Sequence, residues 1–582
     1  MRIADSPLAR LYRVSPADRP KLRIGLLLDT PRLLACMARV VDDIRSSNFA
    51  ELCLVVYNGS ASKPAEPQRP RSIAARLARL ARNKAARRQL FYYRYTLWDQ
   101  AHAGISDDPL ALCDYSDVLA GVPSMTVEPI THKFTHRFPE DAVAAIRSHE
   151  PDVLLRFGFN IIRGDILKAA RYGVWSFHHG DNEYYRGGAP HFWELVERHP
   201  HTGVILQVLT EELDGGMVLA KGLFATEHGL SVAKNRYGPY WGTTHFVIQK
   251  LYELHRHGWD FVRSRMLPEA PYRGRRKLYR MPDNWEMTRW LSGELAGKVT
   301  AAVLHPLQSR TRLHWRIGVR LSKTPLFEEG TGALASFRWC EAPAGRSYAD
   351  PILFEREGRR WIFVEDYEYD RKQACISVGE ISETGDVGAL TPCLTRPYHL
   401  SYPLVFSHEG EIFMLPETGS HGCVELYRAK NFPSEWTLEK VLLPLRAVDT
   451  TPLYHGGQWW FFTTITEPQG CSAFGLLFTA ATLTGDWVLH PASPISFSAA
   501  DARSAGPILR LGGRLLRPTQ SACPTYGASF SVHEITQLDG ERYEQKTIAT
   551  IDPAGLLQLK GAHTYTRVGD MEAIDGCWAV KK

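Results

Sequence analysis

Short, strongly apolar runs alternate with helix-like stretches in the first part of the chain. Each run has about the length of a buried strand, and the stretches between them carry apolar residues at helical spacing. Strand–helix–strand order predicts a parallel sheet. Strands are expected at 22–28, 52–57, 125–130, 152–159, 174–177 and 202–209, and helices at 31–44, 139–148 and 232–257.

From about residue 326 the pattern changes to short strands in repeated units. Each unit starts with a Pro and an apolar strand, followed by a Gly turn and a second strand. The starting prolines are Pro351, Pro403, Pro452 and Pro507. Successive prolines are 52, 49 and 55 residues apart, and a partial fifth unit starts near Gly561. Such repeats are typical of propeller blades, so residues 326–582 are predicted to form an all-β, five-bladed β-propeller.

Polar side chains lie at or near comparable positions of these units. They are Asp350, Tyr402, Glu417, Asp449, Arg503 and His563. A ring of acidic, basic and imidazole groups suits a sugar, so these six residues are predicted to bind a carbohydrate substrate. Two of the carboxylates could act as acid and base if one pKa is raised. Alternatively, the Asp-Pro and Pro-Glu pairs are only turn residues. Trp361, Trp459 and Trp460 are expected in the cores of the blades.

The length of 582 residues is too great for a single core. A composition of 44% hydrophobic and 23% charged residues is that of a globular protein. No apolar run approaches the roughly 20 residues that span a bilayer, and the N-terminus lacks the apolar core of a signal peptide. The ten cysteines show no C-x-x-C spacing. We therefore expect free thiols, no metal site and a cytoplasmic location.

Part of the net charge of +6 is concentrated in residues 69–94, which lie within a predicted helical, basic insertion at 59–120. Ile73, Leu77 and Leu80 have helical spacing there. A charge run is usually a solvated face, which favours a basic helix packed through its Ala and Leu residues. The alternative is an anionic partner, such as a membrane surface, a nucleotide-sugar or a nucleic acid.

The stretch 172–222 carries the most specific motifs of the chain. The apolar strand at 174–177 ends in a His, and the strand at 202–209 leads to an Asp. Both would lie at the carboxyl edge of a sheet, where open α/β folds place their sites. The motifs are, in order, His178, Arg186-Gly187, Pro190, Thr202-Gly203-Val204 and Leu213-Asp214-x-Gly216. This order resembles the formyltransferase family, which includes methionyl-tRNA formyltransferase and the sugar N-formyltransferases.

The resemblance implies a Rossmann-type α/β formyltransferase-like domain over 1–230 and a helical or irregular connection over 231–325. It implies formyl transfer from N10-formyltetrahydrofolate to an amine, with an amino sugar as the expected acceptor. The implied catalytic residues are His178, Asp214 and Ser176, the last standing where the family has Asn. The implied folate-pocket residues are Phe157, Gly158, Phe159, Ile161, Arg186 and Gly187, and the implied acceptor contacts are His179 and Asn182. No OB-fold module for tRNA is seen.

The repeated region resembles the N-terminal domain of plant glucosamine inositolphosphorylceramide transferases and the arabinanase/xylosidase-type five-bladed propellers. In the formyltransferase hypothesis it would hold the acceptor glycan. Two other functions stay open. One is a catalytically retired glycan-binding protein, because Ser176 is a weaker oxyanion donor than Asn. The other is a glycosidase or glycosyltransferase that acts through the propeller.

Overall fold

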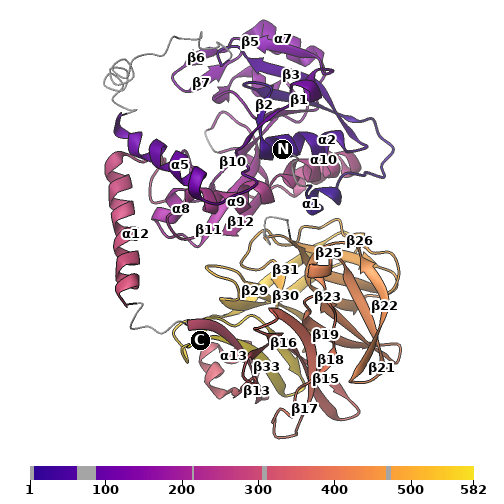
Figure 1. Ribbon diagram of the computed structural model, residues 1–582. Coiled ribbons are helices and arrows are strands. Elements are labelled where there is room, and N and C mark those ends of the chain that lie inside the picture. Colours follow the sequence, from indigo (N-terminus) through magenta and orange to yellow (C-terminus); the bar gives the residue numbers. More distant parts are fainter. Residues whose placement is uncertain (1–4, 62–86, 213–214, 305–310, 467–472, 582) are drawn as a thin grey trace. The chain divides into compact units, whose positions relative to one another are not determined.

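The computed structural model describes residues 5–61, 87–212, 215–304, 311–466 and 473–581 (Figure 1). The chain divides into two compact units, the first formed by residues up to 299 and the second by residues 300–466 and 472–582. Each unit has its own sheets and hydrophobic core, and the two are described separately.

The first unit is an α/β unit built around a seven-stranded sheet in the order β12–β11–β10–β8–β1–β3–β5. Five strands are parallel, as predicted. The apolar runs of β1, β8 and β10 are largely buried, as is usual for strands covered on both faces. The other two, β11 and β12, extend the sheet as an antiparallel hairpin. The strands are β1 (Leu22–Leu28), β3 (Ala50–Asn58), β5 (Ser124–Val127), β8 (Val153–Arg156), β10 (Val174–His178), β11 (His201–Val208) and β12 (Met217–Ala225).

Several elements of this unit differ from the sequence prediction in their bounds. The helix expected at 31–44 begins later, because Arg32–Leu34 forms β2 and pairs with β4 (Leu112–Asp114). The helix expected at 232–257 is two helices, α9 and α10, with α9 ending at Gly242. The helices are α1 (Pro7–Arg10), α2 (Ala35–Arg45), α5 (Leu90–His102), α6 (Ser116–Leu119), α7 (Glu140–Ser148), η1 (Asp165–Lys168), α8 (Trp193–Val196), α9 (Val232–Gly242), α10 (His245–His257), α11 (Trp259–Ser264) and α12 (Asn284–Leu304). A small sheet contains β6 (Ile130–His132), β7 (Thr135–Arg137) and β9 (Ile161–Arg163).

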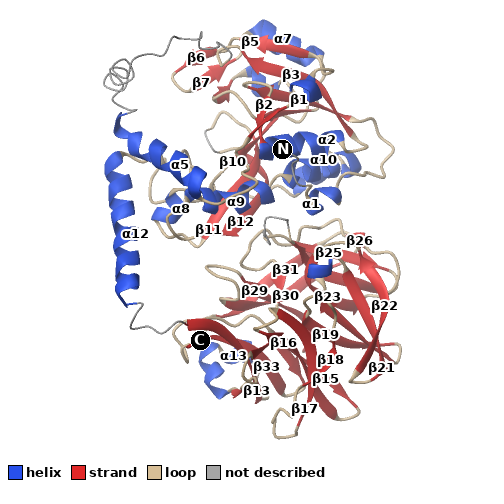
Figure 2. Cartoon of the chain, viewed as in Figure 1, coloured by secondary structure: helices blue, strands red, loops and turns tan. Residues whose placement is uncertain are grey.

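The second unit is all-β, as predicted, and consists mainly of five antiparallel sheets (Figure 2). Its first sheet has the order β14–β13–β33–β32, so β13 (Thr311–Leu321) pairs along its whole length with the last strand, β33 (Met571–Lys581). The other strands of this sheet are β14 (Arg338–Cys340) and β32 (Tyr565–Val568), and three short helices are α13 (Leu326–Glu329), η2 (Thr331–Ser336) and η3 (Gly419–His421).

The other four sheets follow one another along the chain. The second contains β15 (Arg346–Arg356), β16 (Arg359–Glu368), β17 (Gln373–Ile381) and β18 (Thr391–Leu394). The third contains β19 (Ser401–His408), β20 (Glu411–Glu417), β21 (Val424–Asn431) and β22 (Glu435–Leu443). The fourth contains β23 (Ala447–His455), β24 (Gln458–Ile465), β25 (Gly475–Ala480) and β26 (Val488–Leu489). The fifth contains β27 (Arg503–Ser504), β28 (Leu509–Leu511), β29 (Arg514–Ser521), β30 (Ser529–Leu538) and β31 (Tyr543–Ile551).

Aromatic side chains fill the core of the second unit. Trp459 and Trp460 are buried, as expected for blade-core residues, and Trp361 is half-buried against a cluster that includes Phe363 and Trp436. The repeated strand pattern therefore predicted correctly that Trp459 and Trp460 are buried. No helix in the described part of the chain has the length and apolar character needed to cross a membrane.

Candidate functional sites

The carboxyl edge of the parallel sheet in the first unit is tied together by Asp29, which follows β1. Its Oδ1 accepts hydrogen bonds from the Phe159 N–H and from Asn58 Nδ2, each at 2.8 Å. Gly158 lies directly against this turn, and a Cβ at that position would be 2.2 Å from the backbone nitrogen of Asp29. The strand expected to run through Phe159 therefore ends at Arg156 and turns, with Phe159 in the left-handed region at φ 61°.

Gly158→Ala is expected to destabilise the first unit by about 3 kcal/mol, because the new methyl group meets backbone atoms that cannot rotate away. Urea unfolding of the full chain, followed through the transition of the first unit, measures the loss. Gly121→Ala is the matched control, because a Cβ at Gly121 meets nothing within 4 Å. Equal stabilities of the two variants would show that the turn relaxes.

Two of the predicted catalytic residues lie on β10, and the third, Asp214, lies outside the described residues. Ser176 is buried, and its Oγ accepts a hydrogen bond from Arg156 Nε at 3.0 Å. His178 Nε2 lies 2.8 Å from the carbonyl oxygen of Tyr185. Both side chains share one face of the strand, since they are two residues apart. The hydroxyl of Ser176 is thus engaged by a neighbouring guanidinium.

His179 is held by stacking on Tyr240, with ring centroids 3.9 Å apart and planes within 8°. Burial, and then the charges of His178 and Arg236, lower the pKa of His179 to about 3, so the imidazole is neutral. It lines a cavity of about 130 Å³ together with Phe157. This cavity could hold only a small group.

The other residues implied by the formyltransferase motif lie around the same region. Arg186 Nε donates to the carbonyl oxygen of Asn182 at 3.0 Å. Gly187 has φ 100°, and a Cβ there would lie 2.3 Å from the Tyr279 carbonyl oxygen. Ile161 lines a second small cavity, of about 100 Å³, beside His178. The loop is therefore closely packed against the segment that contains Tyr279.

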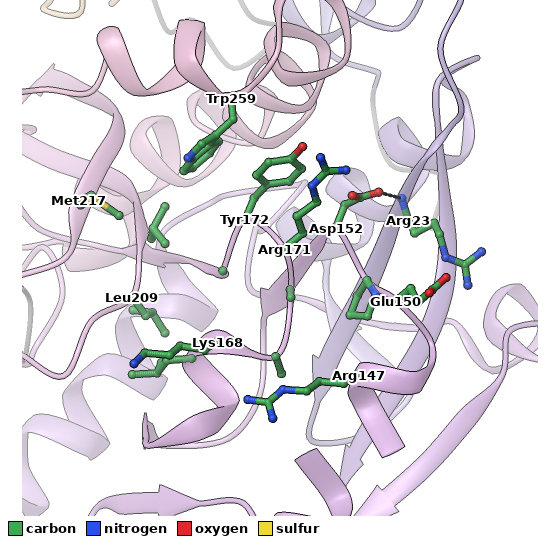
Figure 3. Close-up of a pocket in the computed structure, with 16 residues that line it drawn as sticks. Arg23, Arg147, Glu150, Asp152, Lys168, Arg171, Tyr172, Leu209, Met217 and Trp259 are labelled. Atoms are coloured by element: carbon green, nitrogen blue, oxygen red, sulfur yellow. Dashed lines mark hydrogen bonds between the residues drawn. The ribbon is translucent and has the colours of Figure 1, made fainter. Parts of the chain in front are cut away.

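A large hollow in the first unit lies at the opposite, amino edge of the sheet, with a volume of about 850 Å³ (Figure 3). Asp152 and Gly173, which precede β8 and β10, line it together with Arg23 and Trp259. None of the residues predicted to form a site lines this hollow. The volumes of the cavities therefore do not favour the carboxyl edge of the sheet as the place of a binding site.

Three sheets of the second unit share a β-bulge at the start of a strand pair. Asp350, Tyr402 and Asp449 have φ values of 49°, 47° and 48°, in the left-handed region. At each bulge the pairing skips this residue and the next one. Non-glycine residues in this conformation cost roughly 1–3 kcal/mol each. Three at equivalent positions indicate a feature that the surrounding contacts maintain.

The bulges direct backbone N–H groups toward carboxylates of the preceding sheet. The Asp350 N–H donates to Asp575 Oδ2 at 3.2 Å, and the Tyr402 N–H donates to Asp350 Oδ2 at 3.0 Å. The Asp449 N–H donates to Glu417 Oε2 at 3.3 Å. The same device therefore draws carboxylates from successive sheets together. We call the resulting set the carboxylate cluster: Asp350, Glu417, Asp449, Arg503, His563 and Asp575.

Arg503 is the cation that joins two of these carboxylates. Its Nε lies 2.6 Å from Asp449 Oδ2, and its Nη2 lies 3.6 Å from Glu417 Oε2. Asp449 Oδ2 also accepts a hydrogen bond from Gln520 Nε2 at 2.9 Å. The Tyr526 ring lies beside the guanidinium, 5.0 Å from ring centroid to Cζ, and is half exposed. An exposed aromatic ring next to charged hydrogen-bonding groups suits a sugar, which has apolar C–H faces and polar edges.

His563 forms the other end of the cluster. Its Nδ1 lies 2.5 Å from Asp575 Oδ2 and 3.7 Å from Asp350 Oδ1. Thr564 Oγ1 donates to Asp350 Oδ1 at 2.7 Å, and the Trp315 ring stacks on the imidazole at 4.2 Å. Every one of these groups except Trp315 is at least nine-tenths buried. The cluster is thus a preorganised polar network and not a set of solvated turn residues.

The environment of the cluster raises the pKa values of Glu417, Asp350 and His563, among others. Burial, and then the charge of Asp449, raise the pKa of Glu417 well above its usual range. Burial raises the pKa of Asp350 to about 7, although His563 opposes the shift. Burial would lower the pKa of His563, but the charge and hydrogen bond of Asp575 outweigh it and raise that pKa to about 9. The raised pKa of Glu417 favours its protonated form, which is the form that a proton donor needs.

The structure brings together all six residues that the repeat predicted to bind carbohydrate. Five of them belong to the carboxylate cluster, and the sixth, Tyr402, donates its backbone N–H to Asp350 of the cluster. It also corrects the alignment of the third unit. The position equivalent to Asp350-Pro351 is Asp449-Thr450, because the bulge falls there and not at Thr451-Pro452. Pro452 therefore lies two residues after the position that Pro351 occupies in its own unit, and the spacing between prolines alone could not reveal this shift.

Sequence reasoning missed Asp575, Gln520 and Trp315. Asp575 lies in β33 and Trp315 in β13, two strands that pair although they stand at opposite ends of the unit. Gln520 lies near the end of β29, opposite Arg503. A search for polar residues on the second strand of each unit could have found Gln520. Nothing in the local sequence marks the other two.

Comparison with known proteins bears on the second unit. Residues 338–557 match the family described as glucosamine inositolphosphorylceramide transferase 1, N-terminal. The protein of that name from Oryza sativa subsp. japonica is 32% identical over 254 residues, which cover 40% of this chain and 34% of the relative. A relative from Arabidopsis thaliana has the same name. The chain thus spans about a third of the length of the curated relatives that it matches.

Solved structures show only distant likeness. A family 117 glycoside hydrolase from Zobellia galactanivorans is 10% identical, with a TM-score of 0.30, and the match covers 46% of this chain and 92% of that structure. Glycinamide ribonucleotide transformylase 1 from Symbiobacterium toebii is 14% identical, with a TM-score of 0.26, and covers 44% and 95%. At such scores neither likeness carries an argument about either unit.

The formyltransferase prediction is wrong as an account of function and enzyme class. The curated homologues are named glucosamine inositolphosphorylceramide transferase 1, and the family match lies in the second unit. The motif order in 172–222 therefore did not identify the activity. In the structure the hydroxyl of Ser176 is engaged by Arg156. The folate donor was expected only through that activity.

Proposed function

We propose that the second unit is a carbohydrate-active domain that binds a glycan at the carboxylate cluster and transfers protons at a glycosidic bond. The single observation that carries this proposal is the ion-paired grouping of Glu417, Asp449 and Arg503 beside the buried Asp350. The relatives that match this region are named for glucosamine and inositolphosphorylceramide. The substrate class proposed for this chain is therefore a sugar-bearing acceptor.

We further propose that the five sheets are blades of a propeller. Hydrogen bonds that join successive sheets support this arrangement. Besides the bulge contacts and the Arg503–Asp449 pair, the Tyr565 N–H donates to the Ala505 carbonyl oxygen at 2.7 Å, which links the fifth sheet to the first. Tyr402 Oη donates to the Gly506 carbonyl oxygen at 2.9 Å, across from the third sheet to the fifth. Five sheets joined in this order form a ring around the carboxylate cluster.

The chemistry of a glycosidic bond needs one proton donor and one proton acceptor. Glu417, whose raised pKa favours the protonated form, donates its proton to the oxygen that leaves the anomeric carbon as that C–O bond breaks. Asp350 accepts the proton of the attacking hydroxyl as the new C–O bond forms. Asp449 and Arg503 hold the sugar through charge-assisted hydrogen bonds. After the transfer Glu417 is ionised and Asp350 is protonated, and solvent returns a proton to Glu417 and removes one from Asp350 before the next turnover.

Arg503→Ala is expected to weaken sugar binding by at least about tenfold, because Asp449 and Glu417 lose the cation that they share. Binding of the full chain to an array of glycans, followed by titration of the best ligand, measures the affinity. Arg510→Ala, on the exposed surface of the neighbouring β28, is the control. A wild-type chain that binds no glycan, or an Arg503→Ala variant with unchanged affinity, would contradict the proposed site.

A further inference from the structure

A second cluster of chemically distinctive side chains lies in the third sheet, after β20. His421, Cys423 and Glu425 alternate along the chain, and Gly422 between them has a left-handed φ of 86°. The turn from η3 into β21 brings one ligand atom of each side chain within 4.8 Å of the others. Glu425 Oε1 lies 3.8 Å from His421 Nε2 and 3.8 Å from Cys423 Sγ.

These distances approach those between ligands on one metal ion. Zinc binds sulfur at about 2.3 Å and nitrogen or oxygen at about 2.0–2.2 Å in a tetrahedron. The ligand atoms therefore lie roughly 3.3–3.8 Å apart. A thiolate, an imidazole and a carboxylate also form a donor set that favours Zn²⁺ over Mg²⁺ or Ca²⁺. Their two negative charges would neutralise the ion.

The surrounding groups orient these side chains. Glu425 Oε2 accepts hydrogen bonds from Tyr398 Oη at 2.7 Å and Tyr427 Oη at 2.5 Å, which leaves Oε1 directed at the cluster. The Tyr398 ring stacks on His421 at 4.3 Å, with planes within 10°. Thr418 Oγ1 donates to the Cys423 carbonyl oxygen at 2.6 Å and so fixes the turn. Such outer partners are what a metal site requires to hold its ligands in place.

We propose that His421 Nε2, Cys423 Sγ and Glu425 Oε1 bind one Zn²⁺ ion, with the fourth position open to solvent. Glu425 is buried and His421 is about half exposed, so the ion would have access from the surface. Binding releases the thiol proton of Cys423 to solvent as the sulfur–zinc bond forms. The lack of C-x-x-C spacing predicted no metal site in the sequence. That criterion does not detect a His-x-Cys-x-Glu turn.

The position of this site suggests a positioning role. Gly419, which begins η3, lies against Glu417: a Cβ there would be 3.6 Å from Glu417 Oε1 and 2.9 Å from the Ala447 carbonyl oxygen. A zinc ion two residues further on would fix this turn beside the proposed proton donor. The zinc proposal does not depend on the carbohydrate proposal, because metal binding is measured without any sugar.

The test uses the full chain, freed of metal by a chelator and titrated with Zn²⁺ and with Co²⁺. Wild-type protein is expected to bind one Zn²⁺ tightly and to show a sulfur-to-cobalt charge-transfer band with Co²⁺. Cys423→Ser is expected to lose that band. His421→Ala is expected to lose more Zn²⁺ affinity than the roughly 10–100-fold that loss of an outer partner costs.

Cys340→Ser is the matched control, because Cys340 is also partly exposed and belongs to another sheet. Circular dichroism establishes that each variant is folded. If Cys423→Ser does not fold, His421→Ala decides the question, because its side chain is half exposed. The proposal is overturned if wild-type protein binds no Zn²⁺ at micromolar concentration, or if His421→Ala and Cys423→Ser keep wild-type affinity. Zinc bound without a charge-transfer band for Co²⁺ would equally exclude Cys423 as a ligand.

Discussion

Glu417→Gln is expected to lower the rate of glycosidic-bond chemistry by about 10²–10⁴-fold, the usual contribution of a positioned general acid. Gln keeps the size and the hydrogen-bond acceptor of the side chain but cannot give up a proton. Sugar affinity should therefore stay within a few-fold of wild type. The measurement is product formation from a panel of sugar nucleotides and aryl glycosides with acceptor glycans, together with direct titration of the bound sugar.

Glu411→Gln is the control for this experiment, because Glu411 lies on the same strand, β20, and is exposed. The pH profile adds a second readout. The donor must be protonated, so the wild-type rate should fall as pH rises through the raised pKa of Glu417. The Gln variant should lack that decline. A variant with wild-type rates would refute the assignment of Glu417, and sugar binding without any turnover by the wild type would make the cluster a binding site only.

The parallel part of the first unit could be predicted because burial on both faces leaves a plain signature in the sequence. The run at 22–28 is β1 without any change of bounds. The strand at 202–209 gives no comparable sign of its direction, since an apolar strand looks the same in a parallel and an antiparallel pair. In the structure β11 pairs antiparallel with β10 on one side and with β12 on the other. The direction of a strand relative to its neighbours thus depends on tertiary pairing and not on its own sequence.

The carboxylate cluster was predictable in part, because the repeat places equivalent residues at equivalent bulges. Asp350 and Asp449 could be found in this way. Asp575 could not, because its partner Asp350 lies 225 residues earlier and the two meet only when β13 pairs with β33. The activity was misjudged for a related reason. A motif order such as that around Ser176 records residue types, whereas chemistry depends on which atoms are free to act.

Asp575→Ala is expected to destabilise the second unit by about 3–5 kcal/mol, the cost of removing one partner of a buried ion pair. Asp575 Oδ1 accepts from the N–H groups of His563 and Thr564 at 2.8 and 3.0 Å. Its Oδ2 accepts from the Asp350 N–H and contacts His563 Nδ1. Alanine would leave these groups buried without an acceptor. Urea unfolding of the full chain, followed through the transition of the second unit, measures the effect.

The same contact predicts a pH dependence of known sign. The pKa of His563 is about 9 in the folded chain, above its ordinary value of 6.5. The stabilisation from the protonated imidazole should therefore be complete below about pH 6.5 and lost as pH rises through 9. The difference in unfolding free energy between wild type and Asp575→Ala should shrink over that interval. Asp570→Ala, which breaks an exposed pair with Arg360, should cost at most about 1 kcal/mol. If the two substitutions cost the same, or if the difference is unchanged between pH 6 and pH 10, the His563–Asp575 pair does not stabilise the second unit in this way.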